Sequence, residues 1–176
     1  AKFVGDADNY NLISDMTATL LINKATYDMS AVVFENKTVT YNGSAQSILA
    51  TNLPYGITVT YENNGKIDAS VYTITAKFTG DADNYELIAN KTATLTINKA
   101  TYNMDAVVFE NKTVDYDGNA YSIEATNLPN GITVTYENNG KTDAGEYDII
   151  AKFAGDANNY NLIENKTAKL TINKIS

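Results

Sequence analysis

Hydrophobic and polar residues alternate along several short stretches of this chain, with a period of two. In residues 71–78 every second residue is apolar, namely Tyr72, Ile74, Ala76 and Phe78. Residues 92–98 alternate in the same way, with one face made by Ala93, Leu95 and Ile97. Such alternation predicts β-strands with one buried face. No stretch carries an apolar stripe of period 3.6 long enough for a well-defined helix.

The pattern repeats with a period of 75 residues. Residues 25–99 align without a gap on residues 100–174, with 57 of the 75 positions identical, and residues 1–24 align on residues 76–99. Self-similarity at a fixed period predicts tandem copies of one structural unit. We expect a C-terminal fragment of a preceding repeat at 1–24, a first repeat domain at 25–99, a second at 100–174 and a tail at 175–176.

Comparison of the two copies identifies the buried face of the clearest strand. Within residues 71–78 the copies differ only at positions 71, 73 and 75, which share one face. A strand buried on one side tolerates change on the other, so the unchanged face is expected to line a core.

Turn sequences divide the rest of each repeat. In the first copy they are Asn42-Gly43, Leu53-Pro54-Tyr55-Gly56 and Asn63-Asn64-Gly65, all typical of tight turns. They bound further expected strands at about 31–34, 37–41, 45–51 and 57–62. Six or seven short strands per repeat predict an all-β fold of tandem small antiparallel β-sandwiches of the immunoglobulin-like type. The alternative is a β-grasp-like repeat with one short helix, formed by a single helical turn at 82–87.

Residues 1–24 hold two of these strands without the rest of the repeat. A two-stranded fragment is marginal by itself in water. We therefore expect these strands to pair with an exposed strand edge of a neighbouring domain or chain. The chain starts in mid-repeat at Ala1, and we interpret it as an internal fragment of a longer protein.

Composition excludes several kinds of active site. The chain has no cysteine, histidine or tryptophan, and its 13 positive residues are all lysines. Without imidazole or thiol groups the usual bases, nucleophiles and zinc ligands are missing, so we expect no enzyme, no catalytic residue and no cofactor. The net charge of −8, without arginine or a lysine-rich run, disfavours nucleic acid and anionic membranes as partners. The longest apolar runs are about four residues, too short for membrane insertion.

One short motif resembles immunoglobulin domains. Residues 143–149, Asp-Ala-Gly-Glu-Tyr-Asp-Ile, resemble the Asp-x-Gly-x-Tyr-x-Cys stretch of that family, with Ile149 in place of the cysteine. The first copy keeps Asp68 and Tyr72 but has Ser70 for the glycine. The resemblance implies that Tyr72 and Tyr147 are corner tyrosines, whose hydroxyl groups bond to nearby backbone.

The whole repeat resembles the YDG/MBG-type tandem repeats of bacterial surface proteins. The matching residues are Tyr116-Asp117-Gly118, Gly145-Glu146-Tyr147, Gly155 to Tyr160, and Leu170-Thr171-Ile172-Asn173-Lys174. This resemblance implies an extracellular, array-forming domain at the bacterial cell surface, attached to the cell wall in the parent protein. It carries over no catalytic residue.

Two sets of residues could carry further structural chemistry. Asp81 and Asp83 offer alternate carboxylates that could ligate calcium, but turn-forming Asp and Asn explain the stretch as well, and the second copy has Asn158 for Asp83. We therefore expect no metal. Lys77 and Asn98, on neighbouring expected strands, could form an isopeptide crosslink, but both lie on polar faces, whereas that reaction needs a buried lysine.

Ligand contacts, if the repeats bind anything, are expected at turns. Most of the 13 tyrosines recur at fixed repeat positions, which favours packing over binding. Tyr55 and Tyr121 differ, because their counterparts are Asn130 and Gln46. The candidate contacts are Tyr55, Tyr121, Asn63, Asn64, Asn138 and Asn139.

The expected function is a non-enzymatic stalk or spacer that projects another domain from the cell surface, with neighbouring repeats of the same chain as its partners. Very short Lys-Ala-Thr links between copies favour limited bending. The alternative is an adhesin repeat that binds a host glycan or protein through loop tips at 53–56 and 62–66. Multivalency would then explain the tandem array.

Overall fold

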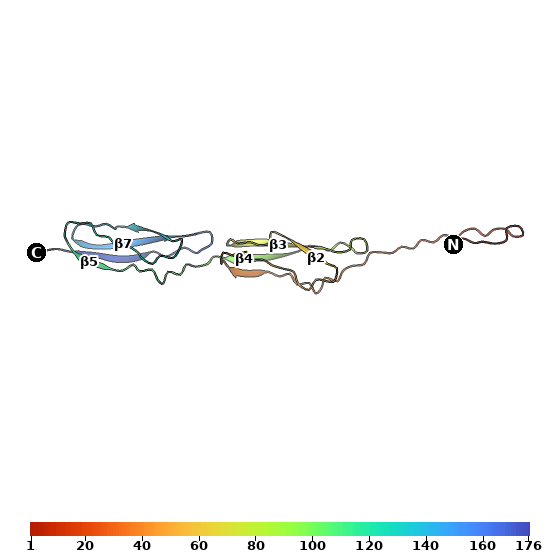
Figure 1. The fold of residues 1–176 in the computed structure, drawn as a ribbon, viewed down its shortest axis with the longest axis horizontal. Coiled ribbons are helices and arrows are strands. Elements are labelled where there is room, and N and C mark those ends of the chain that lie inside the picture. Colours follow the sequence, from red (N-terminus) through yellow and green to blue (C-terminus); the bar gives the residue numbers. More distant parts are fainter.

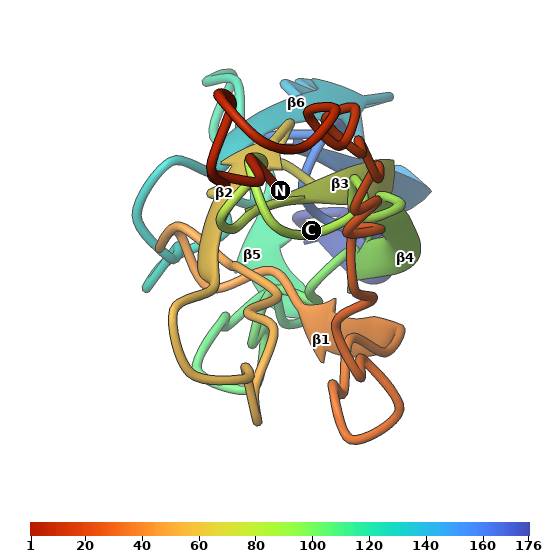
Figure 2. The same ribbon diagram turned by 90° about the vertical axis from the view of Figure 1, so that its right-hand side faces the viewer.

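The computed structural model describes all 176 residues and is elongated, with the two repeats in line and the termini at opposite ends (Figure 1). The first repeat holds β1 (Lys37–Thr40), β2 (Thr58–Glu62), β3 (Ser70–Thr79) and β4 (Lys91–Asn98). The second repeat holds β5 (Lys112–Asp115), β6 (Thr133–Glu137), β7 (Gly145–Ala154) and β8 (Lys166–Asn173). Viewed along the long axis, the second repeat lies behind the first (Figure 2). The fold is all-β, and no helix is present that is long and apolar enough to cross a membrane.

Each repeat contains one four-stranded sheet, in the orders β1-β4-β3-β2 and β5-β8-β7-β6. The central pair, β3 and β4, is antiparallel, with Ser70 opposite Ile97 and Ala76 opposite Lys91. The edge strand β1 pairs with β4 in parallel. The sheet is therefore mixed, whereas the short strands and turn signals of the sequence predicted antiparallel pairing.

A second layer covers one face of each sheet and encloses the core. In the first repeat it is made by extended segments near Val32 and Ile48, joined by a single bridge between Val33 and Thr51. Ile48 packs on the alternate residues of β3 and β4 that were expected to be buried, and Val32 packs on Ala76 and Phe78. The second repeat has equivalent clusters around Ile123 and Val107. Each repeat is thus a small β-sandwich.

Side chains bind the backbone of this second layer where strand ladders are missing. The amide of Asn64 accepts from Ile48 N at 3.1 Å and donates to Ile48 O at 2.7 Å. The hydroxyl of Tyr61 accepts from Ala50 N at 2.7 Å. Because buried backbone groups must find partners, these bonds stabilise an irregular segment that lacks a neighbouring strand.

The strands expected at 37–41, 57–62, 71–78 and 92–98 are confirmed as β1 to β4. Those expected at 31–34 and 45–51 are extended but carry only isolated bridges. The alternative with one short helix is wrong. The Asp81 carboxylate instead accepts from the backbone N–H of Asp83 at 2.9 Å and closes a turn.

The N-terminal segment, residues 1–24, contains no strand and extends away from the first repeat (Figure 1). Ala1 and Met16 hydrogen-bond to each other in both directions, which is the register of Ala76 and Lys91 in the first repeat. Leu20 is 83% exposed, whereas its counterpart Leu95 is fully buried. Pairing of this segment with the first repeat, one of the two partners expected, is not seen, and pairing with another chain stays a prediction.

Gly155, just after β7, tests how tightly the tyrosines pack at the end of the sandwich. A Cβ added there would lie 2.7 Å from both the Tyr102 ring and the Ile132 methyl group. The Tyr102 ring cannot easily move, because it stacks on Tyr160 at 3.9 Å. We expect Gly155→Ala to lower the free energy of unfolding of the second repeat by about 1–3 kcal/mol, measured by urea denaturation.

Gly5→Ala is the matched control. Gly5 occupies the same repeat position in the N-terminal segment and has no atom within 4 Å of its added Cβ. It should leave the unfolding midpoint unchanged. An unchanged midpoint for Gly155→Ala would contradict the packing described here.

Candidate functional site at the junction between repeats

A loop after β7 forms the end of the second repeat that faces the first, and we call Asp156–Tyr160 the docking loop. The Asp156 carboxylate accepts from the backbone N–H of Asn158 at 2.9 Å, and Tyr160 N donates to Asp156 O at 2.9 Å. Hydrogen bonds from the Asn159 side chain, first, and from the Asn158 backbone hold the pKa of Asp156 below its ordinary value. Such an Asx turn is specified by local sequence alone.

The side chain of Asn159 crosses the junction. Its Oδ1 accepts from Ala69 N of the first repeat at 2.7 Å, and its Nδ2 donates to the Asp68 carboxylate at 3.2 Å and to Asp156 at 2.9 Å. Asn159 is 6% exposed and is the one buried polar residue of the chain. The amide thus uses both its donor and its acceptor, as a buried polar group must.

A tyrosine corner fixes the backbone of Asp68, whose carboxylate accepts the hydrogen bond from Asn159. The hydroxyl of Tyr72 donates to Asp68 O at 3.0 Å, and Tyr147 makes the same bond to Asp143 O. The role implied by the immunoglobulin-like motif is therefore confirmed for both tyrosines. Because the corner fixes the backbone at Asp68, it also positions the carboxylate that Asn159 reaches.

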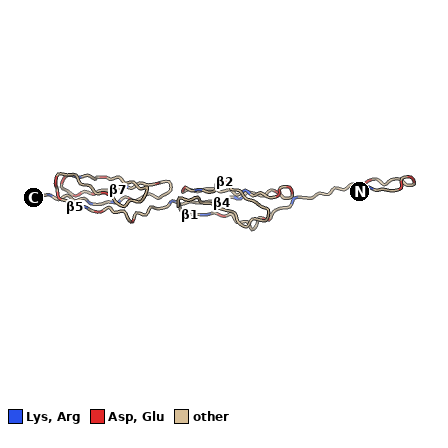
Figure 3. Tube along the Cα trace, in the orientation of Figure 1, with Lys and Arg blue, Asp and Glu red and all other residues tan.

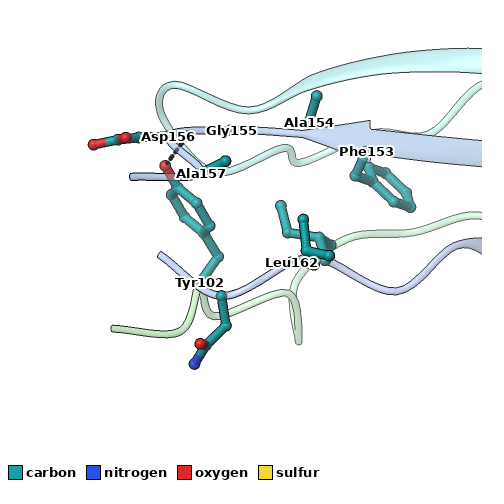
Figure 4. Close-up of a pocket in the computed structure, with 9 residues that line it drawn as sticks. Tyr102, Phe153, Ala154, Gly155, Asp156, Ala157 and Leu162 are labelled. Atoms are coloured by element: carbon teal, nitrogen blue, oxygen red, sulfur yellow. Dashed lines mark hydrogen bonds between the residues drawn. The ribbon is translucent and has the colours of Figure 1, made fainter. Parts of the chain in front are cut away.

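Three tyrosine rings run across the junction in a row. Tyr41 of the first repeat meets Tyr160 edge-on at 5.5 Å, and Tyr160 stacks on Tyr102 at 3.9 Å. The hydroxyl of Tyr102 accepts from Asp156 N at 3.0 Å (Figure 4). Burial, first, and then the charge of Asp156 raise the pKa of Tyr41. Aromatic contacts of this geometry add stabilisation beyond their buried area.

The link between the repeats is short, and both backbone groups of Ala100 in it are hydrogen-bonded. Ala100 N donates to Asn159 O at 2.9 Å, and Asn161 N donates to Ala100 O at 2.8 Å. The ammonium group of Lys99 donates to Ala157 O. The link therefore lies against the docking loop rather than running free.

The cavity beside the docking loop lies within the second repeat and is too small for an ordinary ligand. A cavity of about 120 Å³ lies beside the docking loop, lined on its apolar side by Tyr102, Phe153 and Leu162 (Figure 4). Ligand sites usually measure about 300–1,000 Å³. The chemistry available here is hydrogen bonding and ring packing between repeats.

A profile of the MBG domain matches the chain twice, over residues 30–101 and 106–176. The chain belongs to the MBG domain family. The junction described above therefore joins two MBG repeats, and the resemblance to MBG-type repeats in the sequence is confirmed. No curated protein matches the chain.

Three solved structures are similar to the pair of MBG repeats at low identity. Chicken VE-cadherin EC1-2 is 12% identical with a TM-score of 0.32, over 82% of this chain and 99% of that one. Human protocadherin-24 EC1-2 is 8% identical with a TM-score of 0.30, over 79% and 95%. Drosophila N-cadherin EC1-4 is 13% identical with a TM-score of 0.22, over 81% and 48%.

The candidate contact residues at the turns of the MBG repeats are scattered. Asn64 and Asn139 both bind second-layer backbone, while Asn63 and Asn138 donate to backbone oxygens of the neighbouring strand. Tyr55 is fully exposed at the tip of its turn. Tyr121 is half-buried and lies 5.5 Å from the Lys112 ammonium, beside an open groove. All four asparagines thus use their side-chain amides on backbone groups of their own repeat.

The structure offers little support for a calcium site at Asp81 or for an isopeptide bond between Lys77 and Asn98. Both carboxylate oxygens of Asp81 accept hydrogen bonds within its own loop, and no group of three or more acidic side chains that could hold a metal gathers in the structure. Lys77 forms an ion pair with Glu62. In the register of β3 and β4, Lys77 and Asn98 lie at opposite ends, about 25 Å apart at 3.3 Å per residue.

Asn159 was missed by reasoning from the sequence. A signal was present, because the Asp, Asn and Tyr of the docking loop are identical in all three copies while the residue between Ala and Asn changes. The sequence indicated a turn, a metal ligand set, a helical turn or part of the MBG-type pattern for that stretch, and not a contact between repeats.

Asn159→Ala tests whether the Asn159 amide sets the angle between MBG repeats. The variant leaves Ala69 N and Asp68 without their partners, each bond contributing about 1 kcal/mol. We expect both repeats to stay folded but to lose their common orientation, measured by residual dipolar couplings in each repeat.

Asn84→Ala is the matched control, because Asn84 makes the same bonds within its loop but is exposed and faces no other repeat. It should leave the common alignment intact. The account fails if the two variants have equal effects.

Ionisation of Tyr41 should loosen the junction. Since its pKa is raised on docking, the docked state favours the neutral phenol, so docking is fully stable below the ordinary phenol pKa of about 10 and weakens as the pH rises through the raised pKa. NMR titration of ¹³C-labelled tyrosine checks this.

Asn159→Ala should bring the pKa of Tyr41 towards its ordinary value but leave that of Tyr121, raised chiefly by a hydrogen bond with Asp117. An unchanged Tyr41 titration would count against the docked geometry.

Proposed function

We propose that the two MBG repeats act as a non-enzymatic stalk or spacer in an extracellular protein, holding another domain away from the bacterial cell wall. The observation that carries this proposal is the junction. Asn159, Tyr160 and Lys99 each contact the neighbouring repeat or the link to it, so the repeats are placed end to end (Figure 1). A spacer needs such a junction because free hinges would shorten its reach.

The chemistry of the surface supports a role without catalysis and without nucleic acid. Lysines and acidic residues are interspersed along the length of both repeats (Figure 3). The ion pairs Lys77–Glu62, Lys152–Glu137 and Lys169–Glu146 are all solvent-exposed and contribute little to stability. No imidazole or thiol is present in the chain to serve as a base or nucleophile.

The adhesin alternative would rest on Tyr55 and on the groove beside Tyr121. This groove measures about 570 Å³ and is bordered by Glu110, Lys112 and Glu124. Multivalent binding needs the same contact on each copy, but Asn130 replaces Tyr55 in the second repeat and Gln46 replaces Tyr121 in the first. The spacer proposal is therefore favoured.

Small-angle scattering tests the spacer directly. A chain carrying one additional copy of residues 100–174 should lengthen by the same increment that the second repeat adds to the first. A jointed chain would instead grow roughly with the square root of the number of units. Asn159→Ala in the two-repeat chain should shorten the mean length.

Binding to glycan arrays and mucin separates the two functions. The spacer proposal predicts background signal for the wild-type chain and for Tyr55→Asn and Tyr121→Gln, which install the residues of the other copy. Signal that rises steeply with copy number and is lost in either variant would support the adhesin instead.

A further inference from the structure

The free end of the second repeat carries the same residues that receive the docking loop on the first. We call Tyr41, Asp68 and Ala69 the socket of the first repeat; Tyr116, Asp143 and Ala144 are its counterparts in the second. Tyr41 is half-buried under the docking loop, whereas Tyr116 is 37% exposed. No part of this chain covers the second socket.

The uncovered socket is already formed. The hydroxyl of Tyr147 donates a hydrogen bond to Asp143 O at 3.0 Å, as the hydroxyl of Tyr72 does to Asp68 O. Tyr116 N donates to Asn173 O at 3.0 Å, as Tyr41 N donates to Asn98 O at 2.8 Å. Because the parts are fixed before anything binds, docking there requires little ordering.

One polar group of the uncovered socket lacks a partner. In the first socket the N–H of Ala69 donates to Asn159, but the N–H of Ala144 has no acceptor in the protein. The matching acceptor is an asparagine side chain that can also donate to the Asp143 carboxylate.

The first repeat carries the complementary loop, and no socket faces it there. Residues 81–85 make the same hydrogen bonds as the docking loop. Asp83 N donates to the Asp81 carboxylate at 2.9 Å, and Tyr85 N donates to Asp81 O at 3.0 Å. Asn84 in this loop is exposed. Lys24 donates to Ala82 O just as Lys99 donates to Ala157 O. The loop therefore takes its docking shape whether or not a socket faces it.

We propose that the socket of the second repeat binds the docking loop of a further MBG repeat joined directly after Lys174. The recognition is by the Asp-Ala-x-Asn-Tyr sequence of that repeat, whose asparagine would pair with Ala144 and Asp143 and whose tyrosine would meet Tyr116. This interface is heterologous, with different surfaces on its two sides, so it extends into a line and does not close.

The inference rests on the proposed spacer function for its use in the cell, but it is tested at a single amide rather than by overall length. The first measurement is amide hydrogen exchange in the chain as it is. Ala69 N–H should exchange about tenfold or more slowly than Ala144 N–H, since only Ala69 is bonded across a junction.

The second measurement uses the chain with another copy of residues 100–174 placed directly after Lys174, in place of residues 175–176. Ala144 should then become protected to the level of Ala69. Replacing the docking-loop asparagine of the added copy, the counterpart of Asn159, by alanine should return Ala144 to fast exchange. Replacing the counterpart of Asn158, whose side chain makes no hydrogen bond, should not.

Circular dichroism and the NMR spectrum establish that the added copy is folded in each variant. Fast exchange of Ala144 beside a folded wild-type copy would overturn the proposed socket, even if scattering showed a chain of spacer length. Protection of Ala144 that survives the loss of the asparagine would overturn the proposed mode of recognition.

Discussion

The amide of Asn159 is bonded to its own loop and to the neighbouring repeat at the same time, and the arrangement of the molecule depends on it. An amide that is 6% exposed must keep its partners, because an unpaired buried polar group costs about 1–3 kcal/mol. Two of those partners, Ala69 N and the Asp68 carboxylate, belong to the other repeat. The requirement to satisfy one side chain thus fixes how two sandwiches meet.

On each of the two repeats, a local structural motif positions the residues of this contact. The Asx turn at Asp156 presents the asparagine, and the tyrosine corner at Tyr72 presents the carboxylate. Each motif is specified within a few residues of sequence and recurs in each repeat. Long-range order in a tandem array can therefore arise from short-range structure repeated 75 residues apart, with nearest-neighbour contacts only.

The strands with strict alternation were the part of the fold that the sequence predicted well. β3 and β4 bury the faces that the parity of Ile74 and Leu95 assigns to the core. The second layer was predicted less well, because Asn64 and Tyr61 supply bonds there that a strand partner would otherwise make. The parallel pairing of β1 with β4 depends on how the chain crosses between layers, and residue alternation carries no information about that.

The candidate site was harder to predict for a similar reason. Ala69 and Asn159 lie 90 residues apart, and neither has a chemical signature beyond that of a turn. Alignment of the copies marked the loop as unchanged, but turn formation already explained its Asp and Asn. Only the contrast between buried Asn159 and exposed Asn84 separates a docking residue from a turn residue.

The central claim, that the junction holds the repeats at one orientation, is tested most directly by the distance between spin labels on the two repeats. The chain has no cysteine, so Tyr55→Cys and Asn130→Cys place one label on the same exposed turn of each repeat. Double electron–electron resonance should give a single narrow distance distribution, which broadens when Asn159→Ala is added. A broad distribution before that change, or a narrow one after it, would contradict the account.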